Sequence, residues 1–91
     1  SSFYYLKELP MEYVKIDGSF IRGLADRPDD QALVKAMGQI AKAFGKKTVA
    51  EHVESGAVLA LLAEFEIDYA QGYFTGRPVE MSTAFADDVA A

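Results

Sequence analysis

Short apolar runs alternate with longer segments of helical periodicity, and this alternation constrains the fold more than any other feature of the chain. The predicted strands cover residues 11–18, 48–53 and 67–73. Val, Ile and Tyr favour pleated strands, and a glycine ends the first run. Strands that alternate with helices form a parallel sheet, because each helix carries the chain back to the start of the next strand. The sequence therefore predicts an α/β fold.

The segments between the predicted strands have the apolar spacing of amphipathic helices. The longer helix follows the polar stretch Asp26–Asp30 and takes Asp29 or Asp30 as its N-cap. Gly45 suits the position just after its last turn, and Ser55 suits the N-cap of the next helix. Shorter helical stretches are expected at residues 3–9, 19–24 and 83–90. The residues predicted to face the core in the two main helices are Leu33, Met37, Ile40, Ala41 and Phe44, and then Val58, Leu61, Leu62 and Phe65.

Three parallel strands are too few for a stable domain, because both faces and both edges of a parallel sheet need cover. The chain has 91 residues, of which 51% are hydrophobic, so its composition is globular but its size is small. A (β/α)₈ barrel of about 250 residues contains the same alternation. We therefore expect residues 1–91 to be a fragment, about three βα units, of a TIM-like barrel.

The composition excludes several classes of partner and location. The net charge of −5 argues against binding to a nucleic acid polymer or to an anionic membrane surface. No apolar run approaches the roughly 20 residues of a transmembrane helix, and the start of the chain lacks the pattern of a signal peptide. The chain has no cysteine, and a cytoplasmic location is expected. A small anionic ligand remains compatible, because a metal ion or a few local cations can hold it.

Polar side chains stand at or just beyond the end of each predicted strand. The carboxyl ends of parallel strands share one edge of the sheet, where the active sites of β/α folds are built. Carboxylates there can bind Mg²⁺ or Mn²⁺ and take a proton from metal-bound water, and a lysine can hold water or stabilise a phosphate. Spacing alone leaves a hydrolase, a ligand-binding module and an aldolase-like barrel open. The candidate residues are Lys15, Asp17, Glu51, Glu54 and Gln71.

Four motifs resemble, in order and spacing, those of the second half of the EAL domain family. They are SSFYYLKELP at residues 1–10, KIDGSF at 15–20, AEHVE at 50–54 and QGY at 71–73. A proline, Pro78, follows the last motif, as in the family. The resemblance covers residues 1 to about 80 and identifies the chain as the C-terminal part of an EAL domain.

The resemblance implies a modified (β/α)₈ barrel that hydrolyses cyclic-di-GMP to linear pGpG with Mg²⁺ or Mn²⁺. By resemblance, Lys15 holds the catalytic water near the metal ions, and Asp17 supports the site. Glu51 is the metal ligand or general base, and Glu54 orients a nearby loop or the substrate. Gln71 lies at the rim of the metal site. The implied partner of the complete domain is cyclic-di-GMP.

The sequence departs from the family pattern in two ways. The Glu-Ala-Leu motif and most other metal-binding motifs of the family do not occur in these residues, so the fragment is expected to be inactive and to bind no metal tightly. His52 stands where the AEGVE motif has glycine, and we interpret it as a packed or partly exposed surface residue. A non-catalytic receptor for cyclic-di-GMP, or a protein-interaction module, is the alternative to an enzyme. Open sheet edges also predict self-association of the fragment.

Overall fold

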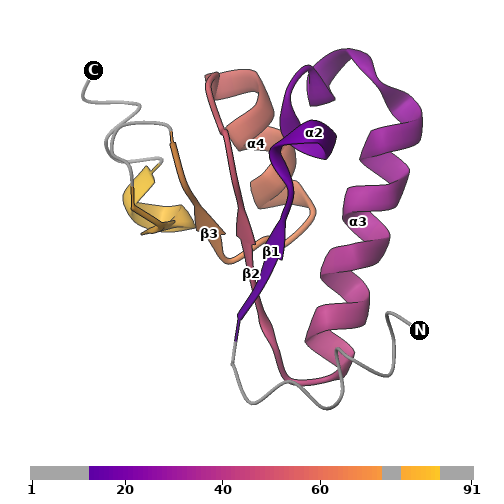
Figure 1. Cartoon of the computed structure of the whole chain (residues 1–91), viewed down its shortest axis with the longest axis vertical. Helices are drawn as coiled ribbons and strands as arrows, with labels where there is room; N and C mark the ends of the chain where they lie inside the picture. Colours follow the sequence, from indigo (N-terminus) through magenta and orange to yellow (C-terminus); the bar gives the residue numbers. More distant parts are fainter. Residues whose placement is uncertain (1–12, 73–76, 85–91) are drawn as a thin grey trace.

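The computed structural model describes residues 13–72 and 77–84 of the chain. These residues form a four-stranded sheet with helices (Figure 1). Its strands lie side by side in chain order: β1 (Tyr13–Ile16), β2 (Lys47–Ala50), β3 (Tyr69–Ala70) and β4 (Val79–Glu80). β1, β2 and β3 are parallel, which confirms the predicted α/β alternation. β4 is antiparallel to β3, and the sequence pattern does not predict it.

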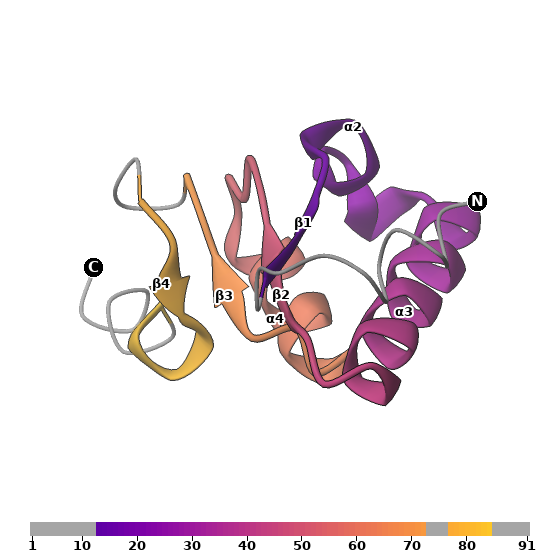
Figure 2. The same cartoon turned by 60° about the horizontal axis from the view of Figure 1, so that its bottom comes forward.

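Two helices connect the parallel strands and pack on the same face of the sheet (Figures 1 and 2). α3 (Pro28–Ala43) joins β1 to β2, and α4 (Gly56–Glu64) joins β2 to β3. α2 (Gly18–Ile21) and the 3₁₀ helix η1 (Leu24–Asp26) lie between β1 and α3, and residues 81–84 are also helical. None of the helices in the described ranges is long and apolar enough to cross a membrane. The chain is therefore built from successive βα units.

The hydrophobic core lies between the sheet and the two helices. Ile16 of β1 and Ala50 of β2 are almost fully buried. Val34 of α3 and the pair Leu59 and Leu62 of α4 belong to the same buried cluster. Burial of a Val, Leu or Ile side chain contributes about 1.5–3 kcal/mol to stability. This core fixes the helices against one face of the sheet.

The opposite face of the sheet carries no helix in the described part of the chain. There the rings of Tyr13 and Tyr69 meet edge to face across β2, with centroids 5.6 Å apart. Together with Lys15, Val49 and Pro78 they line a hollow. Successive side chains of a strand point to opposite faces, so Lys15 projects from this uncovered face and not into the core.

The buried face of α3 differs from the predicted one. Leu33 and Phe44, predicted to point inward, are 41% and 40% exposed. Ala41 is buried as predicted, and Val34 and Gly38 are buried with it at helical spacing. A Cβ at Gly38 would lie 3.2 Å from a carbonyl oxygen just after α4, so only a small residue allows this approach. The prediction was wrong for Leu33 and Phe44, because close packing favours small side chains on this face, whereas the sequence pattern ranked residues by hydrophobicity.

α3 begins at Pro28, and Arg27 in the N-cap position provides no side-chain cap. The predicted N-cap at Asp29 or Asp30 was therefore wrong. Proline suits the first helical position because its ring fixes φ and it needs no partner for an N–H group. The two aspartates lie in the first turn, where negative charge complements the helix dipole. At the other end Gly45 has a left-handed φ of 69°, as expected for the residue after a helix.

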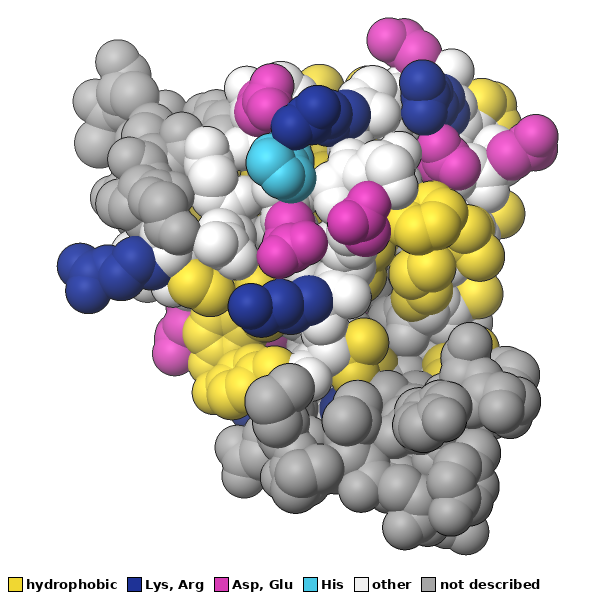
Figure 3. Space-filling model, in the orientation of Figure 1, with side chains coloured by type: hydrophobic (Ala, Val, Ile, Leu, Met, Phe, Trp, Pro, Cys, Tyr) yellow, Lys and Arg dark blue, Asp and Glu magenta, His cyan; other side chains and the backbone are white. Residues whose placement is uncertain are grey.

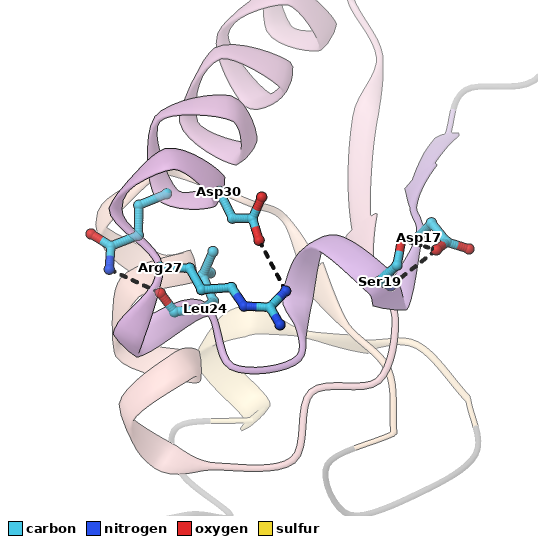
Figure 4. Close-up of polar contacts among 6 residues, drawn as sticks. Asp17, Ser19, Leu24, Arg27 and Asp30 are labelled. Atoms are coloured by element: carbon cyan, nitrogen blue, oxygen red, sulfur yellow. Dashed lines mark hydrogen bonds and ion pairs between the residues drawn. The ribbon is translucent and has the colours of Figure 1, made fainter.

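Side-chain contacts hold the loop that leads into α3 (Figure 4). Gln31 Nε2 donates a hydrogen bond to the Leu24 carbonyl oxygen at 2.9 Å. Arg27 Nη1 lies 3.4 Å from Asp30 Oδ2, one helical turn further on. These contacts attach η1 to the first turn of α3, and they lie apart from the strand ends.

β2 and β3 end earlier than predicted. β2 stops at Ala50, before the predicted end at Val53, because His52 has a left-handed φ of 59° that breaks the extended path. β3 spans only Tyr69–Ala70 of the predicted residues 67–73. The predicted helix at residues 3–9 and most of the one at 83–90 lie outside the described residues.

At the amino ends of β2 and β3, here called the base, polar groups bind one another. Thr48 is 1% exposed, and its backbone N–H donates to Asp68 Oδ2 at 2.9 Å. The Thr48 hydroxyl accepts from the Asp68 N–H at 3.1 Å and donates to Asp68 Oδ2 at 3.2 Å. Lys42 of α3 and Glu66 after α4 form a hydrogen-bonded ion pair nearby, which raises the pKa of Lys42 and lowers the pKa of Glu66. These pairs fix β2 and α3 against the start of β3.

Candidate functional site

The last residues of β1, β2 and β3 are register partners across the sheet. Asp17, Glu51 and Gln71 each come directly after one of them. The Glu51 N–H donates to the last carbonyl of β1 at 3.2 Å, and the Gln71 N–H donates to the last carbonyl of β2 at 2.9 Å. These bonds hold the three positions at one level of the sheet. The rim is the name used below for the carboxyl edge that carries Lys15, Asp17, Glu51, Glu54 and Gln71.

Most of the rim is accessible, as the view in Figure 3 shows, although Gln71 Oε1 is buried. Acidic and basic side chains gather around the histidine over the carboxyl ends of β1 and β2. Lys15, Asp17 and Glu54 are exposed, while Glu51 and Gln71 are half-buried. The structure therefore brings all five predicted residues to one edge. At this edge of β/α folds, side chains are free to reach a ligand.

Asp17 has a local structural role at the rim. It is the N-cap of α2, and its Oδ2 accepts from the Ser19 N–H at 3.0 Å and from the Ser19 hydroxyl at 2.5 Å (Figure 4). The hydrogen bonds from the Ser19 hydroxyl and N–H lower the pKa of the Asp17 carboxyl below its ordinary value of 3.8. Asp17 is therefore held in its ionised form by the helix that it caps.

His52 has an unusual backbone conformation. Its left-handed φ of 59° costs about 1–2 kcal/mol for a residue with a side chain, whereas glycine adopts it freely. The turn allows the Val53 N–H to donate to the Gln71 carbonyl at 3.0 Å, so the segment after β2 stays bonded to the end of β3. His52 thus makes the turn that a glycine would make. Its side chain is exposed, which confirms the prediction of a surface residue.

Arg22 lies beside the rim, although the sequence patterns did not indicate it. Its Nη2 is 3.1 Å from His52 Nδ1, and its Nε is 3.9 Å from Glu54 Oε1. Arg22 is the C-cap of the short helix α2, while the other two residues belong to the loop after β2. The signal available in the sequence is a cation one helical turn beyond the KID motif. Its two partners are about 30 residues further along the chain, so no local motif contains Arg22 together with either of them.

The described rim does not by itself form a metal site. In residues 13–72 and 77–84, no group of three or more His, Asp or Glu side chains lies close enough to hold an ion. Glu51 can serve as one ligand, but Mg²⁺ takes about six oxygen ligands from carboxylates, waters and substrate phosphates, and two-metal phosphodiesterase sites need further carboxylates. A divalent metal would therefore need carboxylates from outside the described residues.

The family model of the EAL domain matches residues 1–78 of the chain. The cyclic di-GMP phosphodiesterase PdeB of Shewanella oneidensis is 43% identical over 83 residues, which cover 91% of this chain and 10% of PdeB. The bifunctional diguanylate cyclase/cyclic di-GMP phosphodiesterase MucR of Pseudomonas aeruginosa is 40% identical over 79 residues, which cover 87% of this chain and 12% of MucR. The chain thus spans about a tenth of the length of these curated relatives.

Solved EAL structures contain the same arrangement of strands and helices. The EAL domain of Mycobacterium smegmatis DcpA superposes with a TM-score of 0.75 at 33% identity, over 99% of this chain and 40% of that one. PaMucR phosphodiesterase, solved as a complex with c-di-GMP, gives a TM-score of 0.74 at 38% identity, over 91% of this chain and 34% of that one. The similarity therefore extends over nearly the whole of this chain.

Proposed function

The chain belongs to the EAL domain family, and from this premise we propose that it supplies part of the active site of a cyclic-di-GMP phosphodiesterase. The observation that carries the proposal is the rim, where five polar side chains lie at or just beyond the carboxyl ends of three adjacent parallel strands. In β/α barrels this edge carries the catalytic residues. The names of PdeB and MucR as cyclic di-GMP phosphodiesterases support the same activity and substrate.

The proposed reaction is the hydrolysis of one phosphodiester bond of the cyclic dinucleotide. Water adds to phosphorus, the bond from phosphorus to one ribose oxygen breaks, and that oxygen takes up a proton. The product is the linear dinucleotide pGpG. A bound Mg²⁺ or Mn²⁺ would supply an acidified water and neutralise charge on the phosphate.

Each rim residue has a proposed part in this reaction. Glu51, half-buried at the end of β2, is proposed as a metal ligand or as the base that takes the proton from water. Lys15, whose ammonium group projects from the uncovered face, is proposed to hold that water. Asp17 keeps the end of β1 in place through its cap of α2. Glu54 is proposed to orient a neighbouring loop or the substrate, and Gln71 to line the site.

A non-catalytic receptor for cyclic-di-GMP is the alternative. We favour the enzyme, because Glu51 and Glu54 are both present on either side of the left-handed turn at His52. Inactivity of the isolated fragment stays a prediction, as does its self-association through the outer edge of β1, which has no partner strand among the described residues.

A chimera tests the proposal, with this chain in place of the matching third of the PaMucR phosphodiesterase. We expect the chimera to release pGpG from cyclic-di-GMP with Mg²⁺, and the 91-residue chain alone to release none. Glu51→Gln should lower kcat by about 100-fold or more, since a positioned acid or base contributes about 10²–10⁴-fold.

Glu64→Gln is the matched control, because Glu64 is an exposed glutamate at the far end of α4 from the rim. It should leave the rate unchanged. A folded chimera that binds cyclic-di-GMP without hydrolysing it would refute the enzyme and favour the receptor. An unchanged rate for Glu51→Gln would refute the role assigned to Glu51.

A further inference from the structure

Arg22 joins the two loops that follow β1 and β2. It caps the carboxyl end of α2, and its guanidinium group reaches across to His52 and Glu54. The Arg22 side chain is 62% exposed, so packing alone does not place it there. A rigid planar fork that donates in two directions is well suited to hold two partners at once.

The contact with Arg22 decides how the His52 ring is arranged. A guanidinium group has N–H donors and no acceptor, so Nδ1 of His52 is the acceptor of the 3.1 Å contact. The ring hydrogen is then on Nε2. A flipped ring would present carbon in place of Nδ1 and lose the hydrogen bond. Arg22 therefore selects one tautomer and one orientation of the ring.

In this orientation the ring lies directly over Gly18. A Cβ atom at position 18 would come within 2.1 Å of His52 Cδ2 and 2.7 Å of His52 Cγ. On the other side a Cβ at Gly72 would lie 3.4 Å from His52 Cα. The start of α2 and the residue pair after β3 thus contact His52 from two sides, and its ring fills the space that a side chain at position 18 would take.

The turn at His52 is anchored to both neighbouring strands. The Glu51 N–H bonds to β1, and the Val53 N–H bonds to the carbonyl just after β3. A left-handed φ in a residue with a side chain persists only where surrounding contacts hold it. The His52 ring packed against Gly18 supplies such a contact, and the hydrogen bond from Arg22 fixes the orientation of the ring.

We infer that Arg22 is a positioning residue that acts through His52. The Arg22 guanidinium group keeps the His52 ring packed against Gly18. The packed ring stabilises the left-handed turn at His52, and this turn places Glu51 and Glu54 at the rim. This assignment rests on the proposed function for the chemical use of the two carboxylates. The geometry can be measured without any hydrolysis.

NMR of the folded chimera at about pH 8, where imidazole groups are in general neutral, tests the inference. We expect a nuclear Overhauser effect between His52 Hδ2 and Gly18 Hα, with the Gly18 Hα signals displaced by the ring current. Arg22→Ala should abolish that effect, return the Gly18 signals toward ordinary positions and shift the amide signals of Glu51 and Val53.

Arg27→Ala is the matched control, because Arg27 is 59% exposed and pairs with Asp30 away from the rim. It should leave all of these signals in place. The inference is wrong if Arg22→Ala keeps the His52–Gly18 contact. It is equally wrong if signals change throughout the sheet with a lower melting temperature, since Arg22 would then be a general structural residue. A chimera without hydrolysis would refute the proposed function and leave this result standing.

Discussion

The base and the rim lie at opposite ends of the same strands and carry similar kinds of residue. At the base, Thr48 and Asp68 bind each other through three hydrogen bonds, and Lys42 and Glu66 pair beside them. At the rim, Glu51 is attached to the sheet through its backbone, and its half-buried carboxylate stays accessible. Polar groups that bind one another stabilise the fold, whereas polar groups held by their backbone are available for chemistry.

Both ends also contain a residue with a side chain in the left-handed conformation. Glu66, with φ 62°, comes directly after the C-cap Phe65 of α4, where left-handed residues commonly end helices. His52, with φ 59°, lies in a loop between two strand ends. The same conformation therefore serves helix termination at the base and side-chain placement at the rim.

The largest effect is expected at the base. Asp68→Ala should lower the free energy of unfolding by about 2–3 kcal/mol, because it removes the charged acceptor of both the Thr48 N–H and the Thr48 hydroxyl hydrogen and leaves the nearly buried N–H unsatisfied. Glu51→Ala at the rim should change it by less than about 0.5 kcal/mol. Urea denaturation of both variants measures the difference. Equal losses of unfolding free energy in Asp68→Ala and Glu51→Ala would contradict the view that the base stabilises the fold more than the rim does.

An intermediate loss of stability is expected where the His52 ring packs against Gly18. Gly18→Ala should cost about 1–2 kcal/mol, since the new methyl group overlaps the ring. In the His52→Gly background the same change should cost close to nothing, which gives a coupling energy of about 1 kcal/mol or more in a double-mutant cycle.

Gly45→Ala is the control for that cycle. Unlike Gly18, Gly45 has a positive φ, and a Cβ there would meet nothing within 4 Å. Its cost should be backbone strain alone, of about 1 kcal/mol, and should be the same with His52 or with glycine at position 52. If Gly18→Ala were equally costly in both backgrounds, the ring would not occupy the space over Gly18.

The smallest effect is expected at the cap of α2. Ser19→Ala removes the hydroxyl that lowers the pKa of Asp17, so that pKa should rise toward its ordinary value of 3.8. A lowered carboxyl pKa adds stability above the unfolded value, and this is lost as pH falls through the folded value. The unchanged chain should therefore keep the Asp17 carboxylate at lower pH than the variant does. Carbon-13 NMR titration of the carboxyl group measures this, and identical curves would contradict it.

Features that depend on near neighbours in the sequence were predicted well. Alternating runs predicted the three parallel strands, and strand-end polarity predicted that Lys15, Glu51 and Gln71 would converge. The comparison with solved EAL domains confirms that these βα units are part of a TIM-like barrel. Gly45 and Ser55 mark helix ends as expected, because capping involves only adjacent residues.

Features that depend on distant partners were missed or wrong. β4 has two residues and exists through its pairing with β3, so its own sequence carries little signal. The inward face of α3 was misplaced at Leu33 and Phe44 because close approach at Gly38 decides it. Arg22 was missed because His52 is 30 residues away. Only the folded chain brings these pairs together.

In evolutionary terms, the ring of His52 imposes an order on sequence change. Position 52 can accept histidine in this orientation only when position 18 is already glycine, since a Cβ there would lie 2.1 Å from the ring. In reverse, a side chain gained at position 18 has to follow the loss of the ring. The two positions therefore behave as an epistatic pair with a fixed order of substitution.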